Sequence, residues 1–515
     1  MMKTNILLKG GKMNFIKIFL ILIFLFINTI CFASEDKNEK FSDVSISPAT
    51  KACIGCHINF TPGIVKDWFE SRHSKTAPET VINKPDIEKR ISSPSIPAEL
   101  SSYAVGCYEC HSLNAEKHKD TFNHMSRNIH IVVTPEDCKT CHVVEVQQFS
   151  ISKKSYAHKI LMDNTVYRLL TDTVTGIKKH DLDKLILEKP SDSTLHETCL
   201  GCHGTVIDVV STKNISTKIG IMTVPDLKNW PNQGVGRINP DGSRGSCSAC
   251  HARHSFSIEV ARKPYTCGQC HHEPDVPAWN VYEESKHGNI FSSLGKNWNF
   301  TNVPWKIGKD IKAPTCSTCH NSLLVSPEGE IISERTHDFG SRLWVRLFGL
   351  IYSHPQPKSG DTTIIKNKDG LPLPVTFSNE PATEYLIDKD EQIKRQRVFS
   401  NICNSCHSSQ WIKGHFSKMD STINETNTMS MTATSFMLEI WKNKFADNSN
   451  PFDESIEQMW IKQWLFYSNS IRYSSAMTGA PDYTTFKNGW WDLTENLQKM
   501  KDWLDLKKEI YIKKQ

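Results

Sequence analysis

The stretch Cys247-Ser248-Ala249-Cys250-His251, soon followed by Cys267-Gly268-Gln269-Cys270-His271, shows the pentapeptide Cys-x-x-Cys-His twice. Eight copies occur in the 515 residues, and they take up sixteen of the 17 cysteines. At the chain's own cysteine and histidine frequencies, chance would give about 0.02 copies. The remaining copies are Cys53, Cys56 and His57; Cys107, Cys110 and His111; Cys138, Cys141 and His142; Cys199, Cys202 and His203; Cys316, Cys319 and His320; and Cys403, Cys406 and His407. The same motif therefore recurs over most of the chain, from Cys53 to His407.

Each copy has the arrangement that binds a c-type haem. Its two thiols can bond the vinyl groups of the haem, and its histidine can ligate the iron. Zinc ribbons also use Cys-x-x-Cys, but they need paired knuckles and no histidine after every second cysteine. Dithiol redox motifs occur singly, near a βαβ pattern. The sequence therefore predicts eight covalently bound haems, each with one of the motif histidines as its proximal ligand.

The N-terminal leader predicts export. Lys17 precedes an apolar run over 18–27, and Cys31-Phe32-Ala33 places small residues where a signal peptidase cuts. A membrane anchor is the alternative, but the run is short and no second apolar stretch of about 18 residues follows it. We therefore expect residues 1–33 to be a cleaved signal peptide and the mature protein to be soluble in the periplasm.

The net charge gives no reason to expect a nucleic-acid partner. The formal charge is +5, but the leader contributes Lys3, Lys9, Lys12 and Lys17 without any acid, which leaves the rest near +1. Each haem adds two propionates, so the holoprotein should be net negative. A protein of that sign has no electrostatic attraction for nucleic acid.

The ratio of residues to motifs predicts that haems form much of the core, and outside a few strand candidates the pattern along the chain indicates short helices and loops, a mainly α fold. About 480 mature residues and eight haems leave about 60 residues per haem, too few for a separate apolar core around each. We expect a polar N-terminal segment over 34–50, an octahaem domain over 51–415 and a C-terminal helical region over 416–515. Strand candidates are few, namely 129–133 and 206–210.

The region after the last motif has helical periodicity. Asn450 is predicted to cap a helix with Pro451 at its first position. Two apolar stripes follow: Ile456, Met459, Trp460, Trp464 and Tyr467, then Trp490, Leu493, Leu497, Met500 and Leu504. Such stripes are more typical of a packed core than of a ligand site. By contrast, 355–381 is rich in Pro, Gly, Asp and Lys and predicts a surface excursion.

Histidines beyond the motifs are numerous enough to cap every iron. The chain has 21 histidines, so thirteen lie outside the motifs. An electron carrier caps each iron with a second ligand, whereas a catalytic haem keeps one side open. Counting alone therefore cannot show an open site. All eight motifs end in histidine and none in lysine, which argues against the pentahaem ammonia-forming nitrite reductases.

One block of sequence resembles a known family. It begins at Cys247 and continues through His254-Ser-Phe-Ser, Arg262-Lys-Pro, the sixth motif, Trp279, Tyr282 and Ser285-Lys-His287-Gly. With Thr61-Pro62, Ser71-Arg-His73, Ala313-Pro-Thr-Cys316 and Thr336-His337, this pattern is similar to the octahaem hydroxylamine oxidoreductase family. The order and number of motifs agree over about residues 51–411.

This resemblance implies a helical, haem-packed fold, often a homotrimer. Seven haems would carry two histidines, and the fourth, at Cys199, Cys202 and His203, would be open to substrate. The seven distal ligands it implies are His73, His124, His130, His158, His254, His287 and His337. For His180, His354 and His415 we expect surface or hydrogen-bonded positions.

The chain departs from the family members that oxidise hydroxylamine. In those enzymes a C-terminal tyrosine is bonded to the open haem, and the pocket holds an Asp-His pair and a tyrosine. Here Asp275 matches the aspartate, but Val276 replaces the histidine and Arg335 replaces the pocket tyrosine. Phe486 falls at the cross-linking position, although an offset of three residues would bring in Tyr483. The resemblance is therefore to a subgroup without a clear cross-linking tyrosine.

These changes favour reduction. An unmodified haem is better suited to giving electrons, and an arginine holds an oxyanion with fork-shaped donors. The sequence predicts a reductase of nitrite or hydroxylamine with His203, Asp275 and Arg335 at its catalytic site, Asp275 relaying protons. A small cytochrome or a quinol-oxidising complex would be the redox partner. Alternatives are oxidation of hydroxylamine or hydrazine, reduction of a sulfur oxyanion such as tetrathionate, and a non-catalytic electron conduit.

Overall fold

The computed structural model describes residues 44–182 and 184–514. The predicted signal peptide and most of the predicted polar segment 34–50 lie outside these residues. From Ser45 onward the chain forms one unit by its internal contacts. None of the described helices is both long enough and apolar enough to cross a membrane.

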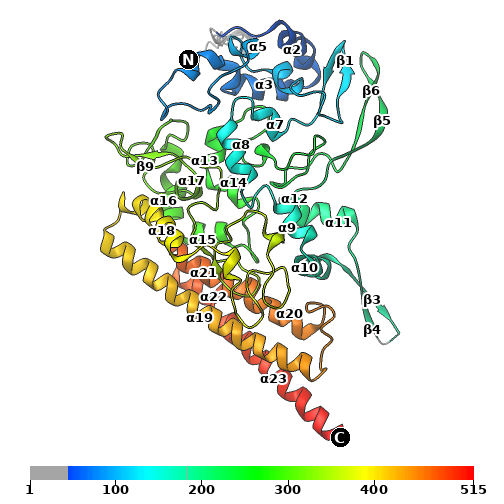
Figure 1. The fold of residues 1–515 in the computed structure, drawn as a ribbon, viewed down its shortest axis with the longest axis vertical. Coiled ribbons are helices and arrows are strands. Elements are labelled where there is room, and N and C mark those ends of the chain that lie inside the picture. Colours follow the sequence, from blue (N-terminus) through cyan, green and yellow to red (C-terminus); the bar gives the residue numbers. More distant parts are fainter. Residues whose placement is uncertain (1–43, 183, 515) are drawn as a thin grey trace, which may run out of the picture. The chain divides into compact units, whose positions relative to one another are not determined.

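The motif-bearing region consists mostly of short helices and loops, as predicted from the pattern along the chain (Figure 1). Its helices are α2 (Pro48–Phe60), α3 (Pro62–Glu70), α4 (Pro78–Ile82), α5 (Ala98–Ser101), α6 (Cys107–His111), α7 (Pro135–Cys138), α8 (Val143–Ser150), α9 (Ala157–Asp163), α10 (Thr165–Thr175), α11 (Asp192–Glu197), α12 (Cys199–His203), α13 (Ile258–Arg262), α14 (Pro264–Gly268), α15 (Ala278–Glu284), α16 (Lys286–Leu294), α17 (Cys316–His320) and α18 (Lys389–Asn404). Single turns of 3-10 helix occur at His73–Lys75, Cys247–Ala249, Gly295–Asn297, Thr362–Ile364 and Thr383–Tyr385.

Strands are few and form small sheets. They are β1 (Phe122–His124), β2 (Arg127–Ile129), β3 (Ile177–Asp181), β4 (Lys184–Glu188), β5 (Asp208–Thr217), β6 (Gly220–Lys228), β7 (Trp305–Lys306), β8 (Leu324–Val325), β9 (Ile331–Ser333), β10 (Val345–Arg346) and β11 (His354–Pro355). Antiparallel hairpins pair β1 with β2, β3 with β4, β5 with β6 and β10 with β11, while β8 joins β7 and β9. The strand expected over 129–133 shares only its first residue with β2, and the one expected over 206–210 is the start of the longer β5.

Long helices make up the C-terminal region: α19 (Ser409–Lys442), α20 (Ser455–Ile461), a π-helical turn (Lys462–Tyr467), α21 (Ser468–Met477), α22 (Pro481–Phe486) and α23 (Trp490–Lys514). Ser408 caps α19 by accepting from the Trp411 backbone N–H. This helix runs without a break through the predicted boundary between residues 415 and 416. Both α21 and α23 pack along α19 (Figure 1).

Both predicted apolar stripes lie in these helices and supply the main apolar core. Trp460, Trp464 and Leu493 are fully buried, and Leu504 is nearly so. The predicted cap at Asn450 is wrong: its side chain accepts from the Phe452 backbone N–H in a turn, and α20 begins later, with Glu454 as its capping residue.

The prediction of a surface excursion over residues 355–381 is wrong. This segment is rich in turn residues, but it packs against the core. Leu373 and Val375 are 1% and 4% exposed and pack in the same apolar cluster as Trp460. The reason is that Leu371, Leu373 and Val375 alternate between its prolines, and alternating apolar side chains in extended chain face one side. This segment therefore helps to fix the C-terminal helices to the motif region.

Candidate functional site

The motif cysteines and histidines are held on short helical turns. In α12, Cys199 and Cys202 are three residues apart and His203 follows four residues after Cys199, so all three side chains share one face. Helix α17 presents Cys316, Cys319 and His320 in the same way. None of the sixteen motif cysteines forms a disulfide in the described part of the chain. Each thiol is therefore available for attachment.

One connected cavity joins most of the motifs. Its volume is about 1910 Å³, and residues of every motif from the second to the eighth line it. Pockets for a single small ligand have volumes of about 300–1,000 Å³. A space of this size, lined by repeated pairs of thiols and by imidazoles, fits several haems held side by side.

Contacts between motif cysteines show which motifs are neighbours. The thiol of Cys138 meets that of Cys247, Cys202 meets Cys270, and Cys267 meets Cys316, and each contact perturbs the pKa values of its two thiols. Weaker electrostatic neighbours are Cys53 with Cys107, Cys110 with Cys141, Cys250 with Cys267, and Cys319 with Cys403. The motifs therefore follow the spatial order first, second, third, fifth, sixth, seventh, eighth. The fourth, with His203, branches from the sixth.

Three predicted distal histidines face a motif histidine at the separation that a shared iron requires. Imidazoles on opposite sides of one iron have ring centroids about 6.2 Å apart, from metal–nitrogen bonds of about 2.0 Å and about 1.1 Å from each nitrogen to its ring centre. The observed separations are 6.2 Å for His57 and His124, 6.4 Å for His142 and His73, and 6.1 Å for His407 and His287. These geometries fit the first, third and eighth motifs.

Two further predicted ligands have a motif histidine as an electrostatic neighbour. Burial lowers the pKa of His254, and His111 lowers it further. Burial also lowers the pKa of His337 to about 3, with His251 as its nearest charged neighbour. These neighbours fit His254 with the second motif and His337 with the fifth. By contrast, His158 lies beside the fourth motif, with its Nδ1 2.7 Å from the Gly204 carbonyl oxygen.

His130, the remaining predicted ligand, lies in a different kind of site. Its ring centroid is 6.0 Å from that of His111, but its Nε2 is turned to the Leu113 carbonyl oxygen at 3.0 Å. Its other face stacks on His118 at 3.6 Å with only 10° between the rings. The nitrogen that would bind the iron is thus engaged by the backbone, so this geometry gives no support to the predicted role of His130.

The His130 ring belongs to a buried polar cluster. His118 lies 3.3 Å from a carboxylate oxygen of Asp120 and 3.3 Å from one of Asp137, and all these side chains are buried. His118, His130 and Asp137 have ligand atoms within 4.8 Å of one another, as a metal site would need. However, nearly parallel stacked rings cannot both direct a lone pair at one ion. We therefore interpret the cluster as a hydrogen-bond network around His118.

Asp275 and His203 are electrostatic neighbours. Burial raises the pKa of Asp275, whereas its backbone hydrogen bonds and His203 lower it, and the net direction is upward. His203 is fixed by its Nδ1, 3.0 Å from the Ala157 carbonyl oxygen. In the described part of the chain, no imidazole ring stacks on or faces that of His203 at the separation seen for the three pairs above.

Two groups were not predicted: Tyr473, an electrostatic neighbour of Asp275, and Arg346, an electrostatic neighbour of Tyr473. Burial raises the pKa of Tyr473 in α21 to about 12, with Arg346 and Asp275 as its charged neighbours. Arg346 in β10 donates from Nε to the Phe348 carbonyl oxygen at 2.6 Å. Both residues line the cavity. No sequence signal marks Tyr473, because α21 (Ser-Asn-Ser-Ile-Arg-Tyr-Ser-Ser-Ala-Met) is polar over most of its length.

Arg335 lies elsewhere on the cavity wall. It forms an ion pair with Glu145 at 2.5 Å, and its charge acts on His142 and His337. The structure thus places Arg335 with the third and fifth motifs, and Asp275 with the fourth. The predicted role of Arg335 at the His203 haem therefore has no support in this geometry. The sequence pattern could not show that Arg335 pairs with Glu145.

The two candidate cross-linking positions differ in their surroundings. Phe486, in α22, is 61% exposed. Tyr483, also in α22, is buried, and its hydroxyl donates to the Glu273 carboxylate. Glu273 lies two residues before Asp275, and Asn469 donates to the Asp275 carbonyl oxygen at 3.3 Å. The C-terminal helices therefore hold the loop that carries Asp275.

Comparisons with known proteins agree with the motif chemistry. A family model described as "Seven times multi-haem cytochrome CxxCH" matches residues 240–330. A solved structure titled "Hypothetical multiheme protein" is 43% identical, covering 91% of this chain and 97% of its own, with a TM-score of 0.85. A Kuenenia stuttgartiensis structure, the reducing HAO-like protein complex Kustc0457/Kustc0458, is 16% identical with a TM-score of 0.59, covering 90% of this chain and 87% of its own, and shares the fold.

A curated relative is longer. The probable nitrite reductase-hydroxylamine oxidoreductase fusion protein of Kuenenia stuttgartiensis is 23% identical over 397 residues, which are 73% of this chain. The match spans only 36% of that protein. Family model, solved relative and motifs agree on one assignment. The chain belongs to the multihaem cytochromes, which bind c-type haems covalently through Cys-x-x-Cys-His motifs.

Proposed function

We propose that this protein is a periplasmic octahaem oxidoreductase that reduces nitrite or hydroxylamine at the haem held by Cys199, Cys202 and His203. The observation that carries the proposal is the set of groups beside this motif. Asp275 and Tyr473 line the cavity as electrostatic neighbours, and Arg346 is the cation that acts on Tyr473. The similarity to a nitrite reductase-hydroxylamine oxidoreductase fusion protein supports the substrate class.

Each of these groups has a chemical task in a reduction. Arg346 donates from its terminal nitrogens to the substrate oxygens, replacing the role first assigned to Arg335. Asp275, whose pKa is raised by burial, delivers a proton as each N–O bond breaks, so that oxygen leaves as water. Tyr473 hydrogen-bonds the same substrate atoms and passes protons to Asp275. When bound at His203, the haem iron supplies the electrons.

The arrangement of motifs gives electrons a route to this site. The fourth motif meets the others through Cys202 and Cys270, so electrons would reach it from the sixth. The exposed motif cysteines are Cys56, Cys270 and Cys406, and two of them belong to the first and eighth motifs at the ends of the series. A small cytochrome or a quinol-oxidising complex would therefore dock at one of these ends. The family resemblance further implies a homotrimer of such chains.

The test is anaerobic mixing of the fully reduced holoprotein with nitrite, following haem reoxidation and assaying hydroxylamine and ammonium. Fast reoxidation with either product is expected, and the ratio of products shows where reduction stops. If the haems stay reduced while hydroxylamine reduces the ferric protein, the direction is oxidative and the proposal fails. Tyr473→Phe is the matched variant, because it removes only a hydroxyl, and it should slow reoxidation by nitrite without changing the haem spectrum.

A further inference from the structure

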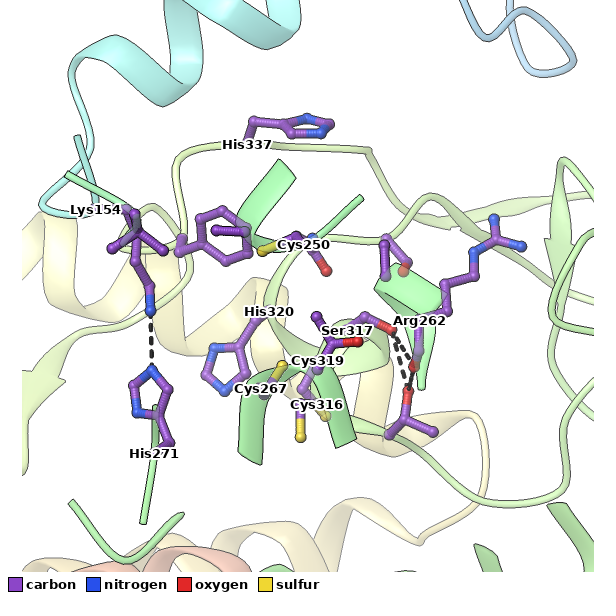
Figure 2. Close-up of a pocket in the computed structure, with 18 of the residues that line it drawn as sticks. Lys154, Cys250, Arg262, Cys267, His271, Cys316, Ser317, Cys319, His320 and His337 are labelled. Carbon is purple, nitrogen blue, oxygen red and sulfur yellow. Dashed lines mark hydrogen bonds between the residues drawn. The ribbon is translucent and has the colours of Figure 1, made fainter. Parts of the chain in front are cut away.

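Lys154 lies at the junction of four motifs. Its Nζ is 2.9 Å from Nε2 of His271, the motif histidine of the sixth haem site (Figure 2). Its charge also acts on His203, His320 and the Cys250 thiol, which belong to the fourth, seventh and fifth motifs. It is the largest cause of the lowered pKa of His271. The amine is therefore directed at this imidazole from within the cavity.

The contact is made with the nitrogen that binds iron in this motif. A hydrogen-bond partner of Nε2 lies along its lone pair, which is the direction of the axial bond. Two nitrogen ligands on opposite sides of one iron are about 4 Å apart, given metal–nitrogen bonds of about 2.0 Å. The distance between Lys154 Nζ and His271 Nε2, now 2.9 Å, would have to increase by about 1 Å. The flexible four-carbon side chain of lysine allows such a movement.

No other group competes for either partner within residues 44–182 and 184–514. Lys154 makes no ion pair there, and its one other described contact is with the ring of Phe339, whose centroid is 5.9 Å from Nζ. The ring of His271 has no histidine facing it at about 6.2 Å, unlike His57, His142 and His407. The neighbouring Lys153 turns away and donates to Gln356 Oε1 at 2.9 Å.

We propose that Lys154 is the second axial ligand of the haem iron bound by His271. The amine loses its proton to solvent as the nitrogen–iron bond forms, and no group is oxidised or reduced. The junction haem thus has one imidazole and one amine, whereas the haems at the ends of the series have two imidazoles. This assignment depends on covalent haem attachment and not on the proposed substrate.

The test compares the oxidised holoproteins of wild type, Lys154→Leu and Lys154→His by electron paramagnetic resonance and near-infrared magnetic circular dichroism. Wild type should show one low-spin haem with histidine–lysine ligation. Lys154→Leu, whose side chain cannot ligate iron, should convert one additional haem per monomer to a high-spin form that imidazole returns to low spin. Lys154→His should remain low-spin but lose the histidine–lysine band.

Lys153→Leu is the matched control, since it removes the adjacent lysine, which donates to Gln356, and its spectra should equal those of wild type. Spectra of Lys154→Leu identical to those of wild type would overturn the proposal. If Lys154→Leu fails to mature, Lys154→His decides: an unchanged near-infrared band would also overturn it. No substrate is used, so a failure here is independent of a failure of the nitrite experiment.

Discussion

Replacing His118 by glutamine should remove a pH-dependent part of the protein's stability. Burial lowers the pKa of His118, but hydrogen bonds to Asp120 and Asp137 outweigh burial and raise this pKa to about 9 from 6.5. A charged imidazole between two buried carboxylates therefore stabilises the folded chain. Because the folded pKa is the higher one, this stabilisation is complete below pH 6.5 and is lost as the pH rises through 9.

The size of the effect follows from the shift. One pKa unit corresponds to about 1.36 kcal/mol, so a shift of about 2.5 units gives about 3 kcal/mol. An unfolding entropy of about 2.1 cal/mol/K per residue converts this into a change of about 3 °C in Tm for a chain of this length. Wild type should thus lose about 3 °C more than His118→Gln between pH 6.5 and pH 9.

The assay is thermal unfolding of the holoprotein followed by circular dichroism at a series of pH values. Comparing the two proteins cancels the titration of groups that both retain. His180→Gln is a suitable control, because His180 is exposed on β3 and the variant should keep the wild-type pH dependence. Equal losses of Tm in wild type and His118→Gln would refute the interpretation of this cluster as a charged hydrogen-bond network.

Four further outcomes are expected. Asp275→Asn should lower kcat for nitrite reduction, measured by stopped flow, by about 10²-fold or more. The wild-type rate should fall as the pH rises through the raised pKa of Asp275, and the rate of Asp275→Asn should not show this fall. Arg346→Leu should raise the nitrite KM about tenfold, whereas Arg335→Leu, at the same cavity but paired with Glu145, should leave it unchanged. His130→Gln should leave the low-spin haem signals of the oxidised protein unaltered, since Leu113 already engages its Nε2. Intact-mass measurement should give the mature chain plus eight haems, without subunits joined on a denaturing gel, because the Tyr483 hydroxyl is held by Glu273.

Local chemistry in this chain could be predicted from sequence because it depends on short spacings. The motif places two thiols and one imidazole on a single helical turn, as α12 and α17 do. Apolar stripes at helical spacing likewise predicted the buried faces around Trp460 and Leu493. The same reasoning misplaced 355–381, since a turn-rich composition does not show that Leu373 packs under the C-terminal helices.

Groups brought together from distant parts of the chain could not be predicted in this way. Arg335 is 190 residues from Glu145 in sequence, and only the fold shows that they form an ion pair. Tyr473 reaches Asp275 because α21 packs against α15, a tertiary contact without a sequence signal. Lys154 was not among the predicted second ligands, which were all histidines.

Because the fourth motif lies on a side branch, electron transfer along the series and the proposed substrate reduction use different motifs. Electrons moving between the first and eighth motifs pass through the second, third, fifth, sixth and seventh and do not have to reach the fourth, with His203. The other haems can then hold electrons while no substrate is bound at the fourth motif, and transfer them to that motif when substrate binds. A chain whose fourth site is poisoned or unfilled would still conduct from end to end, so loss of turnover and loss of conduction are separable defects in this molecule.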